Sequence, residues 1–553
     1  TRFESEPILR TWLPLLNDVL ALGFAESAVT AQMNEQARAE STSELLVHIL
    51  RQAAANIPLV IVLEDAHWMD SMSWNLAARL AQRMAPVLLV LVMRTGQVPD
   101  SAAGKDLLGL AGDARIVLAP LSRADTEALV CDRLGVQGIP PEVMSLIHGK
   151  TDGHPLFSEE LCYALRDSGY LRIDRGQCVI AADAEGLGAP NLPATIEGII
   201  ASRIDRLSAS EQLTLKVAGV VGRGFALPMI GEIHPVGLRQ DEIAGQFRTF
   251  IALDLVRPDE ASDEVRYQFK HAITQEVTYG LLAFAQRRQL HRAAAGWYER
   301  AHQADLSVAY PLLAHHWSRA GDPPTAFNYL HKAGEQAISR YANHEAAEFL
   351  RDALAMLDRL DEVEMRGARV NCERLLGYAR FGLGQLGESR AHLERSFALA
   401  GAPVPSSPRS LVCGVIAQIA VQARNRMLGP RRAAGGVASQ TEREAAASLL
   451  RLGNIAYFSL DIARMLYAGL RALNAAERAG PCSELARNYA SWVSVGGRVP
   501  LLGLARRYSD LALRVADDID EPYATAQVFL FLSIRCADVG DWRAGIDRAE
   551  QAI

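Results

Sequence analysis

The first hundred residues alternate apolar runs and amphipathic segments in the order expected of an α/β domain. Residues 59–63 (LVIVL) and 86–93 are strongly apolar, and a helical pattern at 72–83 lies between them behind Asp70 and Ser71, two good N-cap residues. Such runs predict buried parallel strands joined by a crossover helix. The patterns at 7–22 and 43–55 predict two further helices ahead of the first strand.

Two acidic residues follow the first predicted strand directly. Glu64 and Asp65 come after Leu63, and Arg94 follows the second strand. Strand ends of an open α/β sheet face its ligand crevice, where adjacent acids can hold the water shell of Mg²⁺ and a cation can sense a terminal phosphate. This is a Walker B arrangement. The alternatives are a solvated acidic turn and a surface ion pair, because so short a motif has low specificity.

The phosphate-binding half of such a site is missing from the sequence. No GxxxxGK[ST] string occurs, and such a string is what brings backbone N–H groups and a Lys to the phosphates. Gly149-Lys150-Thr151 has Met144 where the first glycine should stand, and it follows a helical pattern. Residues 1–58 match the stretch between Walker A and Walker B. With Thr1 at the start and Ile553 inside a helical pattern, we expect a piece of a longer protein.

The middle and the rear of the chain are mainly helical in pattern. Helices over 192–256, a polar turn at 259–263 and a strand at 266–269 predict a winged-helix module. It has no concentration of Lys and Arg on one helix. We therefore expect this module to pack against the nucleotide domain and transmit its movements, and not to bind a DNA duplex. From residue 306 onward, amphipathic pairs with Ala and Gly at close positions predict tetratricopeptide-like repeats. These segments are 320–337, 343–357, 382–400, 459–480, 502–517 and 539–552.

The repeats predict a solenoid with a concave surface for a protein partner. Gly497 and Gly540 are 43 residues apart, which exceeds the roughly 34 residues of the usual unit. Residues 401–440 interrupt the pattern with a proline-rich run at 402–408 and a basic patch at 424–436. A solvated loop between repeats is favoured there over a contact with a membrane surface or an acidic partner, since the cations lack interleaved aromatic residues.

Composition narrows the classes of function. A chain of 553 residues should form three or more domains, and its net charge of −7 gives no general attraction to nucleic acid. Seven dispersed cysteines without a CxxC pair predict a reduced, cytoplasmic chain with no zinc cluster of Cys/His spacing. The run 86–93 is far shorter than the roughly 20 residues that span a bilayer, so no membrane span is expected.

Several motifs resemble a known family. The runs at 63–74 (LEDAHWMDSMSW), 123–130 (RADTEALV) and 151–161 (TDGHPLFSEEL) are similar to the signal-transduction ATPases with numerous domains, a branch of the AAA+ class. The runs at 192–225 and 269–282 resemble the ATPase–repeat region that follows class III adenylate/guanylate cyclase domains in bacterial proteins. Related regulators carry a LuxR-type DNA-binding domain at the C-terminus instead.

The resemblance implies roles for individual residues. Glu64 and Asp65 would be the catalytic Walker B acids, which also hold Mg²⁺ through water, although Glu64 stands where the family usually has Asp. Arg94 would be the sensor 1 arginine. Gly153 and Pro155 would form the GxP element whose proline packs on adenine, and His271 would contact the β-phosphate. An ordinary interhelix turn at 153–155 and a core histidine at 271 are the alternatives.

The resulting prediction has four parts: a partial AAA+ ATPase core (1–118), a helical lid (119–190), a winged-helix-like domain (191–300) and tetratricopeptide-like repeats (301–553). Its fold class is α/β followed by a winged helix and an all-α solenoid. The resemblance implies an ATP/ADP- and Mg²⁺-dependent regulatory module, capable of self-association, that controls a cyclase preceding this piece. A LuxR-type activator and a non-enzymatic scaffold with a degenerate ATPase are the alternatives. Nucleic acid is not an expected partner of these residues.

Overall fold

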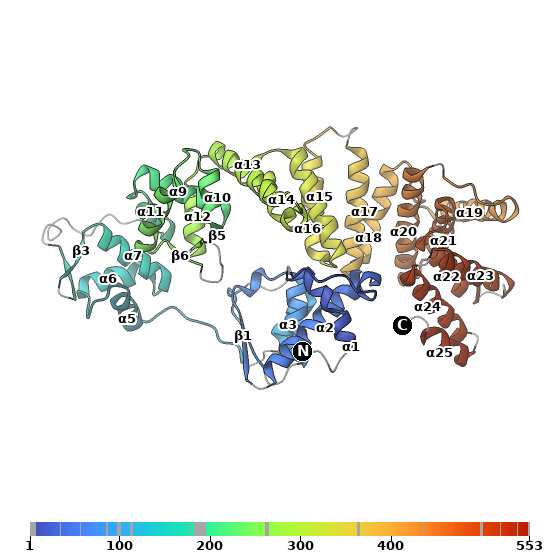
Figure 1. Cartoon of the computed structure of the whole chain (residues 1–553), viewed down its shortest axis with the longest axis horizontal. Coiled ribbons are helices and arrows are strands. Elements are labelled where there is room, and N and C mark those ends of the chain that lie inside the picture. Colours follow the sequence, from blue (N-terminus) through green and yellow to red (C-terminus); the bar gives the residue numbers. More distant parts are fainter. Residues whose placement is uncertain are drawn as a thin grey trace. The chain divides into compact units, whose positions relative to one another are not determined.

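The computed structural model describes residues 7–20, 22–33, 35–55, 57–83, 87–96, 101–110, 114–174, 176–181, 195–259, 265–361, 365–433, 435–497, 502–519, 521–538 and 540–550. The predicted features at 86, 192–194 and 260–263, and both chain ends, lie outside them. The chain divides into two compact units (Figure 1). Unit 1 is Thr1–Ala111 with Leu330–Ile553, and unit 2 is Gly112–Tyr329.

Unit 1 opens with short helical turns rather than with the long helix predicted over 7–22. Helix α1 (Pro7–Thr11) stops, and the 3₁₀ helix η1 (Leu13–Asp18) follows with a proline in its first turn. Proline lacks the N–H that an α-helix needs and clashes with the preceding turn, so Pro14 breaks the helix. A second short turn, η2 (Thr30–Gln32), precedes α2 (Glu35–Ala54), which begins eight residues before the start predicted at residue 43.

The predicted pair of parallel strands is present. β1 (Leu59–Leu63) pairs in parallel with β2 (Val87–Leu91), and α3 (Ser71–Arg83) connects them; η3 (Ala66–Trp68) and α4 (Ala102–Leu110) complete this part. Burial differs from the prediction. The inward residues of both strands pack on α2, α3 and α4, whereas Val60 and Val62 are 56% and 52% exposed. Helices cover one face of this sheet among the described residues, so the strands are half-buried.

Unit 2 begins with three helices and a hairpin in the region predicted as a lid. They are α5 (Arg123–Leu134), α6 (Pro141–Thr151), α7 (Pro155–Asp167) and the antiparallel strands β3 (Leu171–Asp174) and β4 (Gln177–Ile180). Gly149-Lys150-Thr151 lies in the last turn of α6, where its backbone N–H groups belong to the helix. The structure thus agrees that this string is no phosphate loop.

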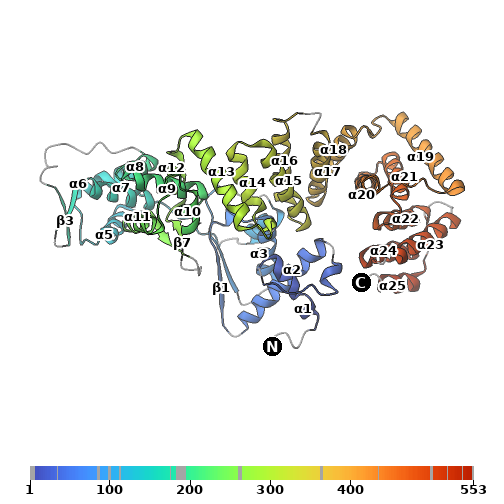
Figure 2. The same cartoon turned by 45° about the horizontal axis from the view of Figure 1, so that its top comes forward.

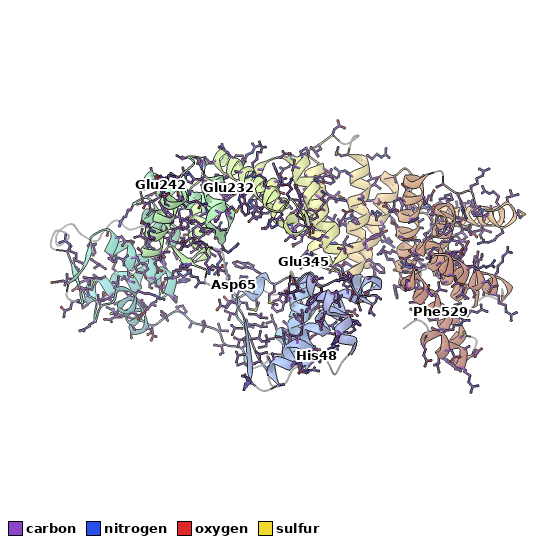
Figure 3. The ribbon with its side chains drawn as sticks, viewed as in Figure 1. His48, Asp65, Glu232, Glu242, Glu345 and Phe529 are labelled. Carbon is purple, nitrogen blue, oxygen red and sulfur yellow. The ribbon has the colours of Figure 1, made fainter. Side chains whose placement is uncertain are left out.

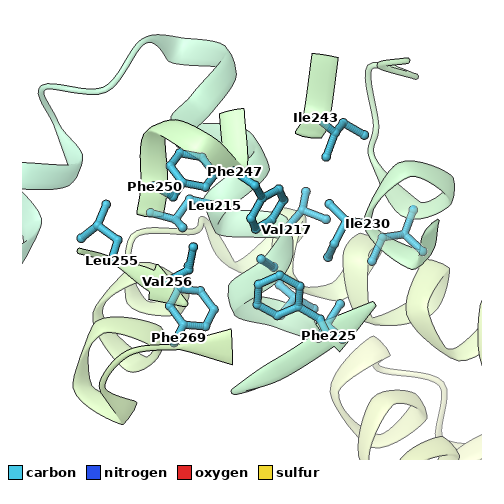
Figure 4. Packing of buried hydrophobic residues seen from close by; sticks show 14 of the residues in the cluster. Leu215, Val217, Phe225, Ile230, Ile243, Phe247, Phe250, Leu255, Val256 and Phe269 are labelled. Carbon is cyan, nitrogen blue, oxygen red and sulfur yellow. The ribbon is translucent and has the colours of Figure 1, made fainter. Parts of the chain in front are cut away.

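The second half of unit 2 surrounds an aromatic core with helices and a small sheet. Its helices are α8 (Ile196–Ile204), α9 (Ala209–Val221), α10 (Leu227–Ile233), α11 (Gln240–Ala252), α12 (Ala272–Gly280) and α13 (Phe284–Ala301). The strands β5 (Gly224–Ala226), β6 (Val256–Pro258) and β7 (Arg266–Phe269) form an antiparallel sheet in the order β5-β7-β6. Phe225, Phe247, Phe250 and Phe269 fill its core (Figure 4). The winged-helix assignment stays a prediction.

From residue 306 onward every described secondary-structure element is a helix, as the repeat pattern predicts. The helices are η5 (Leu306–Ala309), α14 (Tyr310–Ala320), α15 (Pro323–Ser339), α16 (Asn343–Leu357), α17 (Arg366–Gly382), α18 (Leu386–Leu399), α19 (Pro408–Leu428), α20 (Gly436–Phe458), α21 (Ile462–Ala479), α22 (Ser483–Gly497), α23 (Leu502–Ile519), α24 (Pro522–Asp538) and α25 (Trp542–Glu550). Consecutive helices such as α22 and α23 lie side by side (Figure 2). No helix among the described residues has both the length and the apolar character needed to cross a membrane.

Glycines set the close approach of the repeat helices. A Cβ on Gly334 of α15 would lie 2.8 Å from Cγ of Leu350, and a Cβ on Gly377 of α17 would lie 2.8 Å from Cγ of Leu393. The two glycines, like the two leucines, are 43 residues apart. The structural repeat therefore has the long period that Gly497 and Gly540 indicate.

Residues 408–428 form a helix, α19, where the sequence favoured a solvated loop. Ser407 caps the helix, because its Oγ accepts from Ser410 N at 3.2 Å, and Pro408 stands in the first turn, where no N–H is needed. Three side chains of α19 donate to the Glu477 carboxylate of α21: Gln422 at 2.9 Å, Asn425 at 2.8 Å and Arg426 at 2.8 Å. The loop prediction was wrong, and one cation of the basic patch is neutralised within the protein.

A buried ion pair joins the two halves of unit 2. Arg203 of α8 pairs with Glu160 of α7, and their side chains are 2% and 3% exposed. Arg203 also donates to the carbonyl of Leu253. Burial raises the pKa of the Glu160 carboxyl, and the charge and hydrogen bond of Arg203 oppose that rise. Removing one partner of such a pair leaves an uncompensated buried charge.

Substituting Arg203→Met should therefore destabilise unit 2 by about 3–5 kcal/mol. The double variant Arg203→Met/Glu160→Leu should recover much of that loss, because no unpaired carboxylate remains. Arg239→Ala is the control: its pair with Asp241 is 77% and 66% exposed and should contribute less than about 1 kcal/mol. Hydrogen–deuterium exchange of α7 and α8 measures the local opening free energy. Equal exchange in Arg203→Met and Arg239→Ala would contradict this prediction.

Candidate nucleotide site

Backbone hydrogen bonds fix the acidic pair at the end of β1. Val92 N donates to Leu63 O and Ala66 N donates to Val92 O, both at 2.9 Å. The residues just before and just after Glu64 and Asp65 are therefore both hydrogen-bonded to Val92, the residue that follows β2. Asp65 adopts the left-handed conformation, with φ 52° and ψ 36°. For a residue other than glycine this costs on the order of 1–3 kcal/mol, and such strain concentrates at functional sites. Figure 3 labels Asp65 at this strand end.

Arg94 lies beside the segment that follows the acids. Because β1 and β2 run parallel in register, Glu64, Asp65 and Arg94 all follow strand ends at one edge of the sheet. The guanidinium carbon of Arg94 is 5.6 Å from the ring centroid of Trp68, and both side chains are exposed. An aromatic face attracts and orients a cation at such a distance. The structure therefore brings together three of the predicted site residues.

His67 follows the acids by two residues in the sequence and was not among the predicted site residues. Both of its ring nitrogens are buried and have no hydrogen-bond partner among the described residues. Buried polar atoms are nearly always paired, so two orphaned nitrogens mark a place where a ligand or a water would bind. Its position two residues after Asp65 was the only signal available in the sequence.

A side chain of the repeats binds the start of α3. Glu345 of α16, which is labelled in Figure 3, accepts from Ser71 N at 2.8 Å through Oε1 and from Ser71 Oγ at 3.0 Å through Oε2. Asp70 caps the helix as predicted, because its Oδ1 accepts from Ser73 N at 2.7 Å. A carboxylate at a helix N-terminus is stabilised by the free N–H groups and by the helix dipole. The contact joins the helix behind the acids to the repeats.

In unit 2, Gly153 occupies a position that no other residue fits. Its φ is +73°, and a Cβ there would lie 2.1 Å from the carbonyl oxygen of Leu121, whose N–H donates to Gly153 O at 2.9 Å. His154 caps α7, because its Nδ1 accepts from Phe157 N at 3.3 Å. Pro155 follows at the start of α7 and is exposed. An interhelix turn explains this backbone, and it leaves the proline ring open to a flat ligand.

His271 lies at the N-terminus of α12 beside charged side chains. Its Nε2 is buried without a hydrogen-bond partner among the described residues, and burial, followed by the neighbouring charge of Lys270, lowers its pKa. Lys270 pairs with Asp254 and lies 3.8 Å from Glu159. Glu159 belongs to the run 151–161, so contacts in unit 2 link two of the motifs that the sequence singled out.

The six predicted site residues thus fall in two units. Glu64, Asp65 and Arg94 lie in unit 1, and Gly153, Pro155 and His271 lie in unit 2. Their roles remain predictions. The oxygen donors at the β1 end suit Mg²⁺, which prefers carboxylate and water ligands.

Comparisons with known proteins give partial and distant matches. A family model described as a domain of unknown function (DUF8739) matches residues 122–179. An uncharacterised protein of Rhizobium meliloti is 25% identical over 355 residues, which are 63% of this chain and 33% of that protein. Adenylate cyclase type 10 of Mus musculus is 22% identical over an alignment of 256 residues, which covers 40% of this chain and 16% of the cyclase.

A solved structure also matches. It is a signal-transduction ATPase with numerous domains and a tetratricopeptide repeat sensor, from Pyrococcus horikoshii, with a TM-score of 0.36 and 12% identity over 92% of this chain and 78% of that chain. The present chain spans about a third of the length of the Rhizobium relative and 16% of the mouse cyclase.

Proposed function

We propose that this chain is a regulatory module that binds ATP with Mg²⁺ and passes the nucleotide state to a protein partner on its helical repeats. The observation that carries the proposal is the edge of the β1–β2 pair, where the strained Asp65, Glu64 and Arg94 follow adjacent parallel strand ends. Carboxylates and a cation at such an edge suit a metal–phosphate ligand.

Each residue has a defined part in the proposal. Glu64 and Asp65 hold the water shell of Mg²⁺, and Arg94, held against Trp68, contacts the terminal phosphate. For unit 2 by itself, the proposed roles are packing of the exposed Pro155 ring on adenine and contact of His271 with the β-phosphate. Bound Mg²⁺ neutralises phosphate charge. The sequence has no GxxxxGK[ST] string to hold the phosphates. These residues are therefore proposed to sense the nucleotide and not to form the loop that binds its phosphates.

The proposed output is a class III nucleotidyl cyclase. Two observations support this: 40% of this chain is similar to part of adenylate cyclase type 10, and the motifs at 192–225 and 269–282 resemble the region that follows cyclase domains. All seven cysteines are free, which suits a reduced, cytoplasmic setting. If neither ATP nor ADP binds, the alternative of a protein-binding scaffold with a degenerate ATPase replaces this proposal.

The contact between Ser71 and Glu345 offers a route from nucleotide to repeats. Helix α3 begins at Ser71, six residues after Asp65, and its first N–H is held by a carboxylate of α16. A shift of the acids on nucleotide exchange would move the start of α3 and so strain this contact. A switch needs such a difference in contacts between its two states.

Substituting Arg94→Ala should weaken ATP binding about tenfold, or ~1.4 kcal/mol, and should weaken ADP binding less, because Arg94 is proposed to contact the terminal phosphate. Asp65→Asn should remove the Mg²⁺ dependence of binding. Calorimetry on the full chain with and without Mg²⁺ measures both effects. Asp174→Asn, an exposed change on β3, is the control. Equal heats in all four proteins would contradict the nucleotide site.

Substituting Glu345→Gln should loosen the start of α3, because the charge-assisted hydrogen bonds to Ser71 become weaker. We expect faster hydrogen exchange in the first turn of α3 and a severalfold change in the MgATP dissociation constant. Glu348→Gln is the matched control: it lies on the same helix and is exposed. Faster exchange without any change in affinity would show that the contact exists but does not couple the two regions.

A further inference from the structure

Three histidine side chains converge between two helices of unit 2. His291 comes from α13, and His315 and His316 are neighbours on α14. One nitrogen from each ring lies within 4.8 Å of the other two. The ring centroids are 5.1 Å apart for His291 and His316, 5.1 Å for His315 and His316, and 5.8 Å for His291 and His315. We propose that these residues form a binding site for a divalent transition-metal ion, with Zn²⁺ as the type ligand.

The nitrogen spacing is close to that of a tetrahedral site. Nδ1 of His291 and Nδ1 of His316 are 2.9 Å apart. With Zn–N bonds of about 2.0–2.1 Å, two ligands of a tetrahedral ion are separated by roughly 3.3 Å. The separation of 2.9 Å is shorter than that value and no separation within the set exceeds 4.8 Å, so the proposal requires ring rotations that bring all three nitrogens to one ion. A water or another exogenous ligand takes the fourth position, as in three-histidine zinc sites.

Burial lowers the pKa of all three imidazoles below its ordinary value. Burial lowers the pKa of His291 to about 3 and that of His316 to about 3, and the neighbouring cationic groups add to both shifts. His315 lies at the exposed rim, yet packing around its ring lowers its pKa to about 4. A metal ligand must offer a lone pair, so binding requires the proton between the facing Nδ1 atoms to move to another ring nitrogen and Arg319 to release Nδ1 of His315.

Hydrogen bonds within the protein do not satisfy every ring nitrogen of the three histidines. The two facing Nδ1 atoms of His291 and His316 can share only one proton, and Nε2 of His316 is buried with no partner among the described residues. Tyr279 Oη lies 3.1 Å from Nε2 of His291. If that Nε2 carries its proton toward Tyr279, the Nδ1 lone pair faces the other rings. Metal-bound histidines are commonly oriented by such a partner.

Arg319 opposes metal binding and supplies a test. Its guanidinium lies 2.9 Å from Nδ1 of His315, and since arginine only donates, it occupies that lone pair. Its positive charge also repels a divalent ion. The Arg319 side chain is exposed, so it can turn into solvent when an ion binds.

The experiment is a Zn²⁺ titration of the chelator-treated full chain against a competing indicator, with the absorption spectrum of the Co²⁺-loaded chain as a second readout. We expect one ion per chain and the intense visible bands of tetrahedral Co²⁺. His315→Ala, at the exposed rim, should weaken Zn²⁺ binding at least tenfold and remove these bands. Arg319→Gln should tighten binding severalfold. His344→Ala, a histidine of α16 outside the cluster, should change neither readout.

Three results would overturn the proposal. They are the absence of stoichiometric Zn²⁺ binding to the wild-type chain, equal losses in His315→Ala and His344→Ala, and a weak octahedral Co²⁺ spectrum, which would indicate oxygen ligands at the surface. Circular dichroism of each variant shows whether it is folded. If His315→Ala is unfolded, the Arg319→Gln protein decides, since unchanged affinity there also overturns the site.

Discussion

The ion pair between Arg203 and Glu160 holds together three helices of unit 2. Glu160 belongs to α7, Arg203 to α8, and the carbonyl of Leu253, which Arg203 also binds, ends α11. Neither charge could be buried alone, because desolvation of an unpaired ion costs several kcal/mol. The pair therefore favours one arrangement of α7 against the helices around the aromatic core. Glu159 and Lys270 continue the same link toward His271.

The sequence predicts the fold well wherever apolar periodicity and burial agree. Strand β1 and helix α16 have the predicted limits, and α23 begins at the predicted residue. Helix α19 was missed because its pattern is inverted: Val412, Ile416 and Ile419 are exposed, whereas Gln422 and Asn425 are buried. Strand β5 was also missed, since three residues are too few to carry a period. In each case tertiary contacts decide the structure.

Some residues of the candidate sites can be recognised in the sequence, and others are brought together only by the fold. The acids after an apolar strand are visible in the sequence because a strand end and its chemistry are adjacent. The bond between Ser71 and Glu345 joins residues 274 positions apart, and no local pattern encodes it. His291 and the pair at 315–316 do not have the sequence spacing of a known metal-binding motif. They come together only because α13 packs against α14. Antiparallel helix pairs create such clusters only after folding.

The attachment of α19 through Glu477 has a consequence for how this region can change over evolution. Gln422, Asn425, Arg426 and Tyr489 all donate to one carboxylate that is 1% exposed. A buried polar network is favourable only when its members are satisfied together, so losing one donor weakens the whole set. A substitution at any one of these positions is therefore expected to be destabilising unless its partners on α19 and α21 change with it.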